Sequence, residues 1–146
     1  MIKMSKLTEY AFMVIMALKK SDLPASADFL ACVTGLETPT VSKILKQLKK
    51  AGLLDSKRGS SGGYFLIKHK QEISLNDVIV AMEGGLSLTE CADDDEACHL
   101  TESCYMSAGM KRVNQVILKA LQSVTVSDIL DEKKKITLQI KPQSSR

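Results

Sequence analysis

The sequence is poor in aromatic residues and in proline. Its 146 residues include no tryptophan, three tyrosines, three phenylalanines and three prolines. Aromatic residues are enriched in strands, so this shortage argues against an all-β core and favours a mainly helical protein. The length suits one ordinary domain, and a hydrophobic content of 45% is sufficient to bury a core.

Long apolar segments and catalytic signatures are also missing. No apolar run approaches the roughly 20 residues that span a bilayer, and Glu9 interrupts the apolar part of residues 1–20, unlike a secretory signal. We therefore expect a cytoplasmic protein with no membrane partner. A nucleotide fingerprint, a Cys-x-x-Cys pair and a Ser/His/Asp arrangement are absent, so we expect no enzymatic activity.

Charges of both signs are present, but they are unevenly distributed. Residues 1–70 contain 12 Lys or Arg and 5 Asp or Glu, whereas residues 71–146 contain 8 and 12. A basic half of this size suits a polyanion such as double-stranded DNA. The simpler alternative is a solvated basic face that binds nothing.

A pattern of three helices occupies the basic half. The periodicity predicts a first helix over 7–20, a second helix that begins after Ser26 and ends at Gly35, and a third that Thr38 caps and that ends at Lys50. Two short helices joined by a glycine-containing turn are typical of a helix-turn-helix. The polar face of the third helix presents Thr40, Ser42, Lys43, Lys46, Gln47, Lys49 and Lys50.

A glycine-rich hairpin follows the third helix. Residues 53–56 and 64–67 are predicted to be strands around the basic turn 57–63, which is the pattern of a wing; a plain hairpin is the alternative. Arg58 is suited to a minor groove, and the glycines let the backbone approach a phosphate. The predicted DNA-binding residues are Thr40, Ser42, Lys43, Lys46, Arg58, Ser60 and Gly62.

The second half combines a capped helix, a loop and a long helix. Ser74 and Asp77 predict a capping box that opens a helix ending at Glu83. The long helix has an apolar seam at a period of about 3.5 residues, typical of coiled coils. We predict that this seam packs on the same helix of a second subunit, with packing against the first helix as the alternative. The seam consists of Met106, Met110, Val113, Ile117, Ala120 and Val124.

Three cysteines cluster in the acidic loop. Cys91, Cys98 and Cys104 are spaced too widely for paired zinc hooks, but thiolates on such a loop suit an iron-sulfur cluster, either 2Fe-2S or 4Fe-4S. Zinc held with the help of His99, or thiols without a metal, are the alternatives. Cys32 is expected to be a small packing residue inside the second helix.

Four sequence features together resemble one family of winged-helix regulators, which includes the iron-sulfur regulator IscR and the nitric-oxide sensor NsrR. They are Thr8-Glu9-Tyr10-Ala11, Arg58-Gly59 followed by Gly62-Gly63-Tyr64, Ala81-Met82-Glu83-Gly84, and the spaced cysteines. The stretch Leu88-Thr89-Glu90-Cys91-Ala92 most resembles the branch that regulates the Suf assembly operon.

The resemblance implies a homodimer that binds palindromic promoter DNA and represses iron-sulfur assembly genes when a cluster is bound. It also implies that Glu9 is the fourth ligand, because it occupies the position of the acidic ligand in NsrR-like proteins; His99 and Ser107 are the alternative ligands. One departure is Ser107, where IscR has a histidine. A winged-helix protein-interaction module that binds no DNA remains a further alternative.

The predicted fold is mainly α, a winged helix-turn-helix with a long C-terminal dimerisation helix. The expected organisation is a DNA-binding domain over 1–84, a cysteine-bearing loop over 85–105, a dimerisation helix over 106–130 and a tail over 131–146, with a short strand at 136–140.

Overall fold

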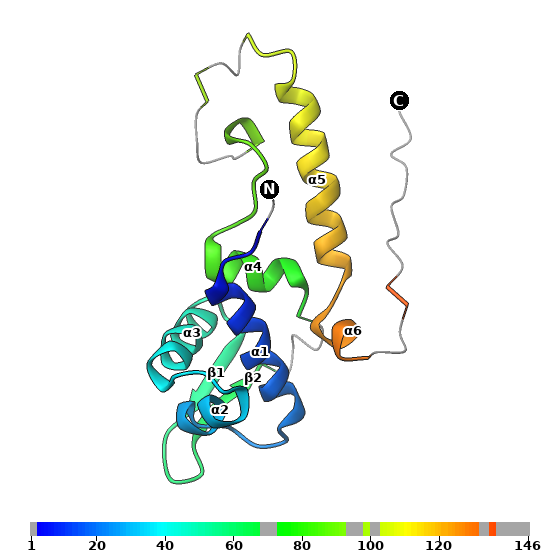
Figure 1. Cartoon of the computed structure of the whole chain (residues 1–146). Coiled ribbons are helices and arrows are strands. Elements are labelled where there is room, and N and C mark those ends of the chain that lie inside the picture. Colours follow the sequence, from blue (N-terminus) through cyan, green and yellow to red (C-terminus); the bar gives the residue numbers. More distant parts are fainter. Residues whose placement is uncertain (1–2, 68–72, 93–97, 100–102, 132–134, 137–146) are drawn as a thin grey trace.

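The computed structural model describes residues 3–67, 73–92, 98–99, 103–131 and 135–136. Its elements are α1 (Lys6–Lys20), α2 (Ala27–Thr34), α3 (Thr38–Lys50), β1 (Leu54–Lys57), β2 (Gly63–Leu66), α4 (Leu75–Glu83), the 3-10 turn η1 (Glu90–Ala92), α5 (Ser107–Ser123) and α6 (Val126–Leu130). Figure 1 shows α1 to α4 and the hairpin gathered together, with α5 projecting from them. This mainly helical fold with one small antiparallel sheet confirms the expected mainly α class, while the long C-terminal dimerisation helix stays a prediction. None of the described helices is long and apolar enough to cross a membrane.

Local signals in the sequence set most helix ends. The Ser26 hydroxyl accepts the backbone N–H of Phe29 at 3.1 Å, and Gly35 ends α2 in the left-handed region with a φ of 71°. Ser74 and Asp77 form the reciprocal capping box predicted for α4. These caps satisfy backbone groups that a helix end leaves unpaired, so α2 and α4 have the predicted caps.

Helix α3 begins one residue before the predicted position. Glu37, not Thr38, is the capping residue, and its side chain makes no capping hydrogen bond. The Glu37 carbonyl accepts the N–H of Val41 at 3.0 Å, so the first helical hydrogen bond already starts there. The prediction that Thr38 caps α3 is therefore wrong, and Thr38 occupies the first turn.

The strands of the hairpin are each displaced by one residue from the prediction. Leu53 is not in β1, because its N–H bonds to the Leu48 carbonyl at 3.0 Å and completes the turn after α3. The two strands pair from Leu54 opposite Leu66 to Lys57 opposite Gly63. The wing turn therefore spans 58–62.

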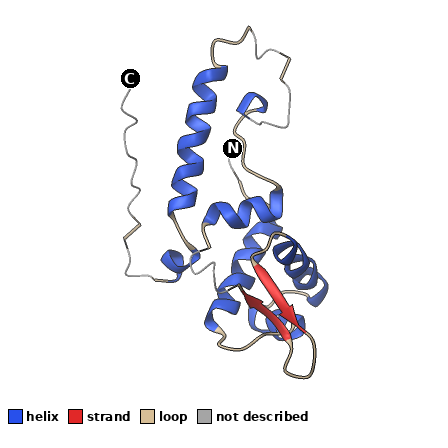
Figure 2. Ribbon diagram, turned by 180° about the vertical axis from the view of Figure 1, so that it is seen from behind, coloured by secondary structure: helices blue, strands red, loops and turns tan. Residues whose placement is uncertain are grey.

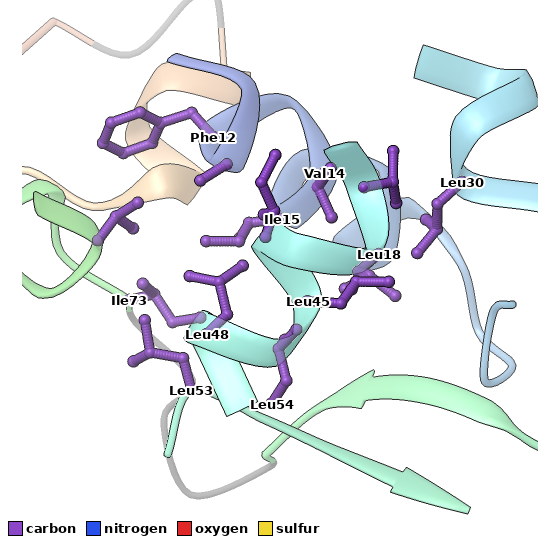
Figure 3. Close-up of a cluster of buried hydrophobic side chains, with 14 of the residues drawn as sticks. Phe12, Val14, Ile15, Leu18, Leu30, Leu45, Leu48, Leu53, Leu54 and Ile73 are labelled. Carbon is purple, nitrogen blue, oxygen red and sulfur yellow. The ribbon is translucent and has the colours of Figure 1, made fainter. Parts of the chain in front are cut away.

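A single apolar core fixes α1, α3 and the hairpin to one another. Figure 3 shows side chains from α1, α2 and α3 meeting between these helices. Ile15, Leu30, Leu45 and Leu48 are fully buried there. Burying a side chain of this size stabilises a fold by about 1.5–3 kcal/mol. Helix α3 is therefore held rigidly by its apolar face.

The single helix expected over 106–130 is wrong, because the structure has two helices there. The chain leaves α5 at Val124, which has an extended backbone. Its carbonyl accepts the N–H of Leu75 at 2.9 Å, and the N–H of Val126 donates to the Ile73 carbonyl at 2.8 Å. A Thr125–Asp128 capping box then opens α6. The C-terminal end of α5 is thereby bonded to the start of α4.

The predicted seam of α5 is only partly available to a second subunit. Met106 and Val113 are 65% and 47% exposed, and Val116 beside them is 45% exposed. Val124 is buried in the chain's own fold, so its assignment to the seam is wrong. The strand expected over 136–140 lies almost entirely outside the described residues.

Candidate functional site

Helix α3 presents the predicted DNA-contacting side chains at the surface. Lys43 and Lys46, three residues apart, are exposed, whereas the hydroxyl-bearing Thr40 and Ser42 are half-buried. The opposite face is buried through Val41, Ile44, Leu45 and Leu48. The structure therefore brings two flexible cations and two small polar groups together on one rigid helix, as groove recognition requires.

Gln47, on the same helix, is half-buried like Thr40 and Ser42. Its side-chain oxygen is buried and has no hydrogen-bond partner within the described part of the chain.

Lys49 lies on the predicted polar face of α3, but its side chain connects α3 to the wing. Its ammonium group donates to the Ser56 hydroxyl at 2.6 Å and lies 3.2 Å from the Asp55 carboxylate. The pKa of Asp55 is lowered, first by the backbone N–H of Ser56 and then by the Lys49 hydrogen bond. The acidic residue in the following strand is the sequence signal for this role.

The wing turn projects beside α3. Figure 2 shows the hairpin and α3 on the same side of the molecule, and Arg58 and Ser60 are exposed in the turn. A Cβ at Gly62 would lie 2.4 Å from the Lys57 carbonyl oxygen. Glycine at position 62 is therefore required by the turn itself, and a DNA contact there stays a prediction.

The base of the wing is anchored to the segment before α2. Ala25 and Tyr64 exchange two backbone hydrogen bonds, at 2.9 and 2.8 Å. Gly63 has a φ of 151°, and a Cβ there would lie 2.6 Å from the Ala25 backbone. A side chain at Gly63 would thus displace the wing from its place beside α3. This third strand-like contact was not predicted, because a single bridge leaves no alternating pattern.

The cysteine segment connects α4 to α5. Cys91 lies in η1 with its sulfur 3.2 Å from the Thr89 hydroxyl, and the Cys104 carbonyl accepts the N–H of Ser107 at the start of α5. Both cysteines and Cys98 are half-buried, and none of the three is in a disulfide. Cys32 is an exposed free thiol, so its expected packing role is wrong. It follows the buried pair Leu30 and Ala31 on α2 and points away from the core.

Glu9 lies in the first turn of α1 and pairs with Lys6. The Lys6 ammonium is 2.6 Å from the Glu9 carboxylate, and this pair raises the pKa of Lys6. The dipole of α1 also favours an acid there. In the described single chain, Glu9 therefore has a local electrostatic role, and its role as a cluster ligand stays a prediction.

Glu83 is a polar link that the sequence did not reveal. Its carboxylate accepts the Thr8 hydroxyl at 2.5 Å and the backbone N–H of Ser5 at 3.0 Å, which joins the end of α4 to the start of α1. The Thr8 hydroxyl and then the Ser5 N–H lower the pKa of Glu83. The link fixes the point where the chain leaves the winged domain for the cysteine segment.

The described residues do not gather a metal site by themselves. No three His, Cys, Asp or Glu side chains among them are placed to hold an ion. Residues 93–97 and 100–102, between the predicted ligands, lie outside the described ranges. The thiols that are described have suitable chemistry, because soft thiolates are the ligands of iron-sulfur clusters. The donor set therefore fits the predicted cluster in its chemistry.

A comparison with known families decides the identity. Residues 4–132 match Rrf2, described as an iron-dependent transcriptional regulator. The chain belongs to the Rrf2 family. Rrf2 proteins are transcriptional regulators that bind DNA, which confirms DNA as a partner of the chain and confirms that the chain is not an enzyme. The assignment of DNA contact to the basic half stays a prediction.

Individual Rrf2 relatives agree with this assignment. The chain is 28% identical to Protein aau3 of Rhizobium meliloti (strain 1021) over 156 residues, which covers 99% of each protein. It is similar to the solved structure of CymR (YrzC), the global cysteine regulator of B. subtilis, with 26% identity, a TM-score of 0.66, and coverage of 88% of this chain and 96% of CymR. It is also similar to T. potens IscR, with 29% identity, a TM-score of 0.60, and coverage of 88% and 86%.

Proposed function

We propose that this Rrf2 regulator is a homodimeric repressor of iron-sulfur assembly genes whose affinity for palindromic DNA is set by an iron-sulfur cluster on Cys91, Cys98 and Cys104. Glu9 is the proposed fourth ligand. A carboxylate is a harder ligand than a thiolate, so this corner would hold iron less firmly and would suit a sensor. The Suf-type branch is proposed from the resemblance of residues 88–92.

One structural observation supports this proposal above all. The cysteine segment lies between α4 and α5, its turn η1 packs against α5, and the far end of α5 is bonded back to residues 73–75. A bound cluster would supply iron sites to which the three thiolates bind. A cluster bound by these cysteines would hold the cysteine segment to α5 and so fix the angle between α5 and the winged domain. In a dimer, that angle sets the separation of the two α3 helices.

Dimerisation is proposed through α5. The exposed apolar side chains of Met106, Val113 and Val116 lie on this helix, outside the core of the winged domain. A dimer with two-fold symmetry reads a palindromic operator, with half-sites about 10 base pairs apart or a multiple of that distance.

The test begins with protein purified without oxygen. We expect iron and acid-labile sulfide in the wild type, and tighter binding to palindromic duplexes selected from a random library than after cluster removal. Cys91→Ala, Cys98→Ala and Cys104→Ala should each lose the cluster and the difference in affinity. Cys32→Ala is the matched control and should keep both. Equal DNA affinity with and without the cluster would contradict the proposal.

A thiol-dependent regulator without iron is the second candidate. Cys91, Cys98 and Cys104 lie outside any disulfide, and this observation and the similarity to a cysteine regulator favour it. In that case the purified protein would contain no sulfide, and oxidation of the thiols alone would change DNA affinity. Zinc without sulfide would instead indicate a zinc-dependent regulator.

A further inference from the structure

Helix α5 buries one polar side chain, that of Asn114. Asn114 is 5% exposed, whereas its neighbours Val113 and Gln115 are both exposed. Its amide oxygen accepts the backbone N–H of Leu88 at 3.2 Å, and its amide nitrogen donates to the Leu86 carbonyl at 3.4 Å. One side chain thus binds both a donor and an acceptor on the backbone that leads to Cys91.

The backbone held by Asn114 is continuous with the turn that carries Cys91. The Ser87 hydroxyl donates to the Thr89 carbonyl at 2.8 Å, and the N–H of Ala92 donates to the same carbonyl at 2.9 Å. Because these short-range bonds make residues 87–92 a compact unit, fixing Leu86 and Leu88 also fixes Cys91. Figure 1 shows this segment running beside α5 toward its N-terminal end.

Cys104 is attached to the same helix by a different route. The N–H of Ser107 donates to the Cys104 carbonyl at 3.3 Å, so Cys104 continues directly into the first turn of α5. The position of Cys104 therefore follows from chain continuity. The position of Cys91 depends on contacts across the chain, and Asn114 provides the described hydrogen bonds between α5 and residues 86–88.

We infer that Asn114 is a positioning residue that fixes the Cys91 turn to α5 and thereby holds Cys91 and Cys104 on one helix. The inference rests on the proposed function in that it assumes the two cysteines act together. A buried amide suits this role because losing it leaves the Leu88 N–H and the Leu86 carbonyl without a partner.

The experiment measures how fast iodoacetamide alkylates Cys91 in the reduced, metal-free protein, with mass spectrometry to resolve each cysteine. Asn114→Leu should speed alkylation of Cys91 by about fivefold to tenfold, the change in local opening expected from the lost hydrogen bonds. Alkylation of the already exposed Cys32 should not change. Gln115→Leu makes a similar substitution at the adjacent exposed position and should leave the Cys91 rate at the wild-type value.

A second variant gives a graded result. Asn114→Asp keeps an oxygen acceptor for the Leu88 N–H and loses the donor to Leu86, so its Cys91 rate should lie between those of wild type and Asn114→Leu. If Asn114→Leu also lowers the melting temperature of the protein, the Cys91 alkylation rate of Asn114→Asp decides whether Asn114 positions Cys91. An unchanged Cys91 rate in a folded Asn114 variant, or an equal rise in Gln115→Leu, would overturn the inference.

The metal-free readout separates the inference from the proposed function. If the wild-type protein holds no iron and Cys91 is alkylated faster in Asn114→Leu, the iron-sulfur proposal is contradicted and the role of Asn114 is supported. A protein that holds a cluster, but shows no effect of Asn114→Leu on Cys91, would support the proposed function and overturn the role of Asn114.

Discussion

The winged domain and the α5 region differ in how they are held together. In the winged domain, α1 and α3 bury whole apolar stripes that include Ile15, Leu45 and Leu48. In α5, the described burial is a single polar residue, Asn114, while Val113 and Val116 are exposed. The winged domain is therefore stabilised by its own core. The α5 region depends on hydrogen bonds and, we propose, on a second subunit and a bound cluster, which makes it the part that can change state.

The largest expected effect is on the winged domain. Leu45→Ala removes a fully buried side chain from α3 and should lower the free energy of unfolding by about 2–5 kcal/mol. Urea denaturation followed by circular dichroism measures this loss. Leu23→Ala, at a position that is 75% exposed, is the control and should change stability little. An equal loss of unfolding free energy in both variants would contradict the conclusion that the winged domain is stabilised by its buried core.

The next effect concerns the dimer. Val113→Asp places a charge in the proposed subunit interface and should weaken dimerisation by about 10- to 100-fold. The unfolding free energy of the winged domain should not change, because Val113 lies outside its core. Sedimentation equilibrium measures the association. Gln115→Asp introduces the same charge at an exposed neighbour and serves as the control. A Val113→Asp protein that stays dimeric would place the interface elsewhere.

The DNA-binding face should respond separately from α5. If Arg58 reads a minor groove, Arg58→Ala should weaken operator binding by about 1–3 kcal/mol and relax sequence preference. Arg112→Ala removes the same exposed group from α5 and should alter binding less. Fluorescence anisotropy on specific and random duplexes separates the two kinds of contact. Equal losses on both duplexes would reduce Arg58 to a phosphate contact.

The smallest effect tests the Glu83 link between the end of α4 and the start of α1, where the chain leaves the winged domain for the cysteine segment. The pKa of Glu83 is below its ordinary value of 4.5, because Thr8 and Ser5 donate to the ionised carboxylate. The stabilisation is therefore complete above about pH 4.5 and is lost as the pH falls through the lowered pKa. Glu83 is exposed, so Glu83→Gln should cost well under about 1 kcal/mol at pH 7 and nothing at strongly acidic pH. Urea titrations at both pH values measure this, with Glu90→Gln as the control.

Sequence patterns predicted the winged domain well because its signals are local. Ser26, Gly35 and the Ser74–Asp77 pair act within a few residues of themselves, and the apolar stripe of α3 repeats with the helical period. The ends of the two strands differ from the prediction by one residue, and Leu53 falls outside β1 because its N–H bonds to the Leu48 carbonyl of α3, which is a contact outside the strand pattern.

The contacts that predictions missed join distant parts of the chain. Lys49 looked like a DNA donor until the fold placed Ser56 and Asp55 beside it. The seam pattern extended through Val124, but that residue pairs with the start of α4 and ends α5. Asn114 gave no signal at all, because its partners are backbone groups that every residue carries.

Amide hydrogen exchange of the dimer, measured before and after removal of the cluster, tests whether the cluster fixes the cysteine segment and α5 without affecting the winged domain. We expect that removal of the cluster lowers the exchange protection of residues 86–92 and 104–113, whereas residues 41–48 of α3 keep their protection. Loss of protection in α3 equal to that in residues 86–92, or no change in residues 86–92, would contradict it.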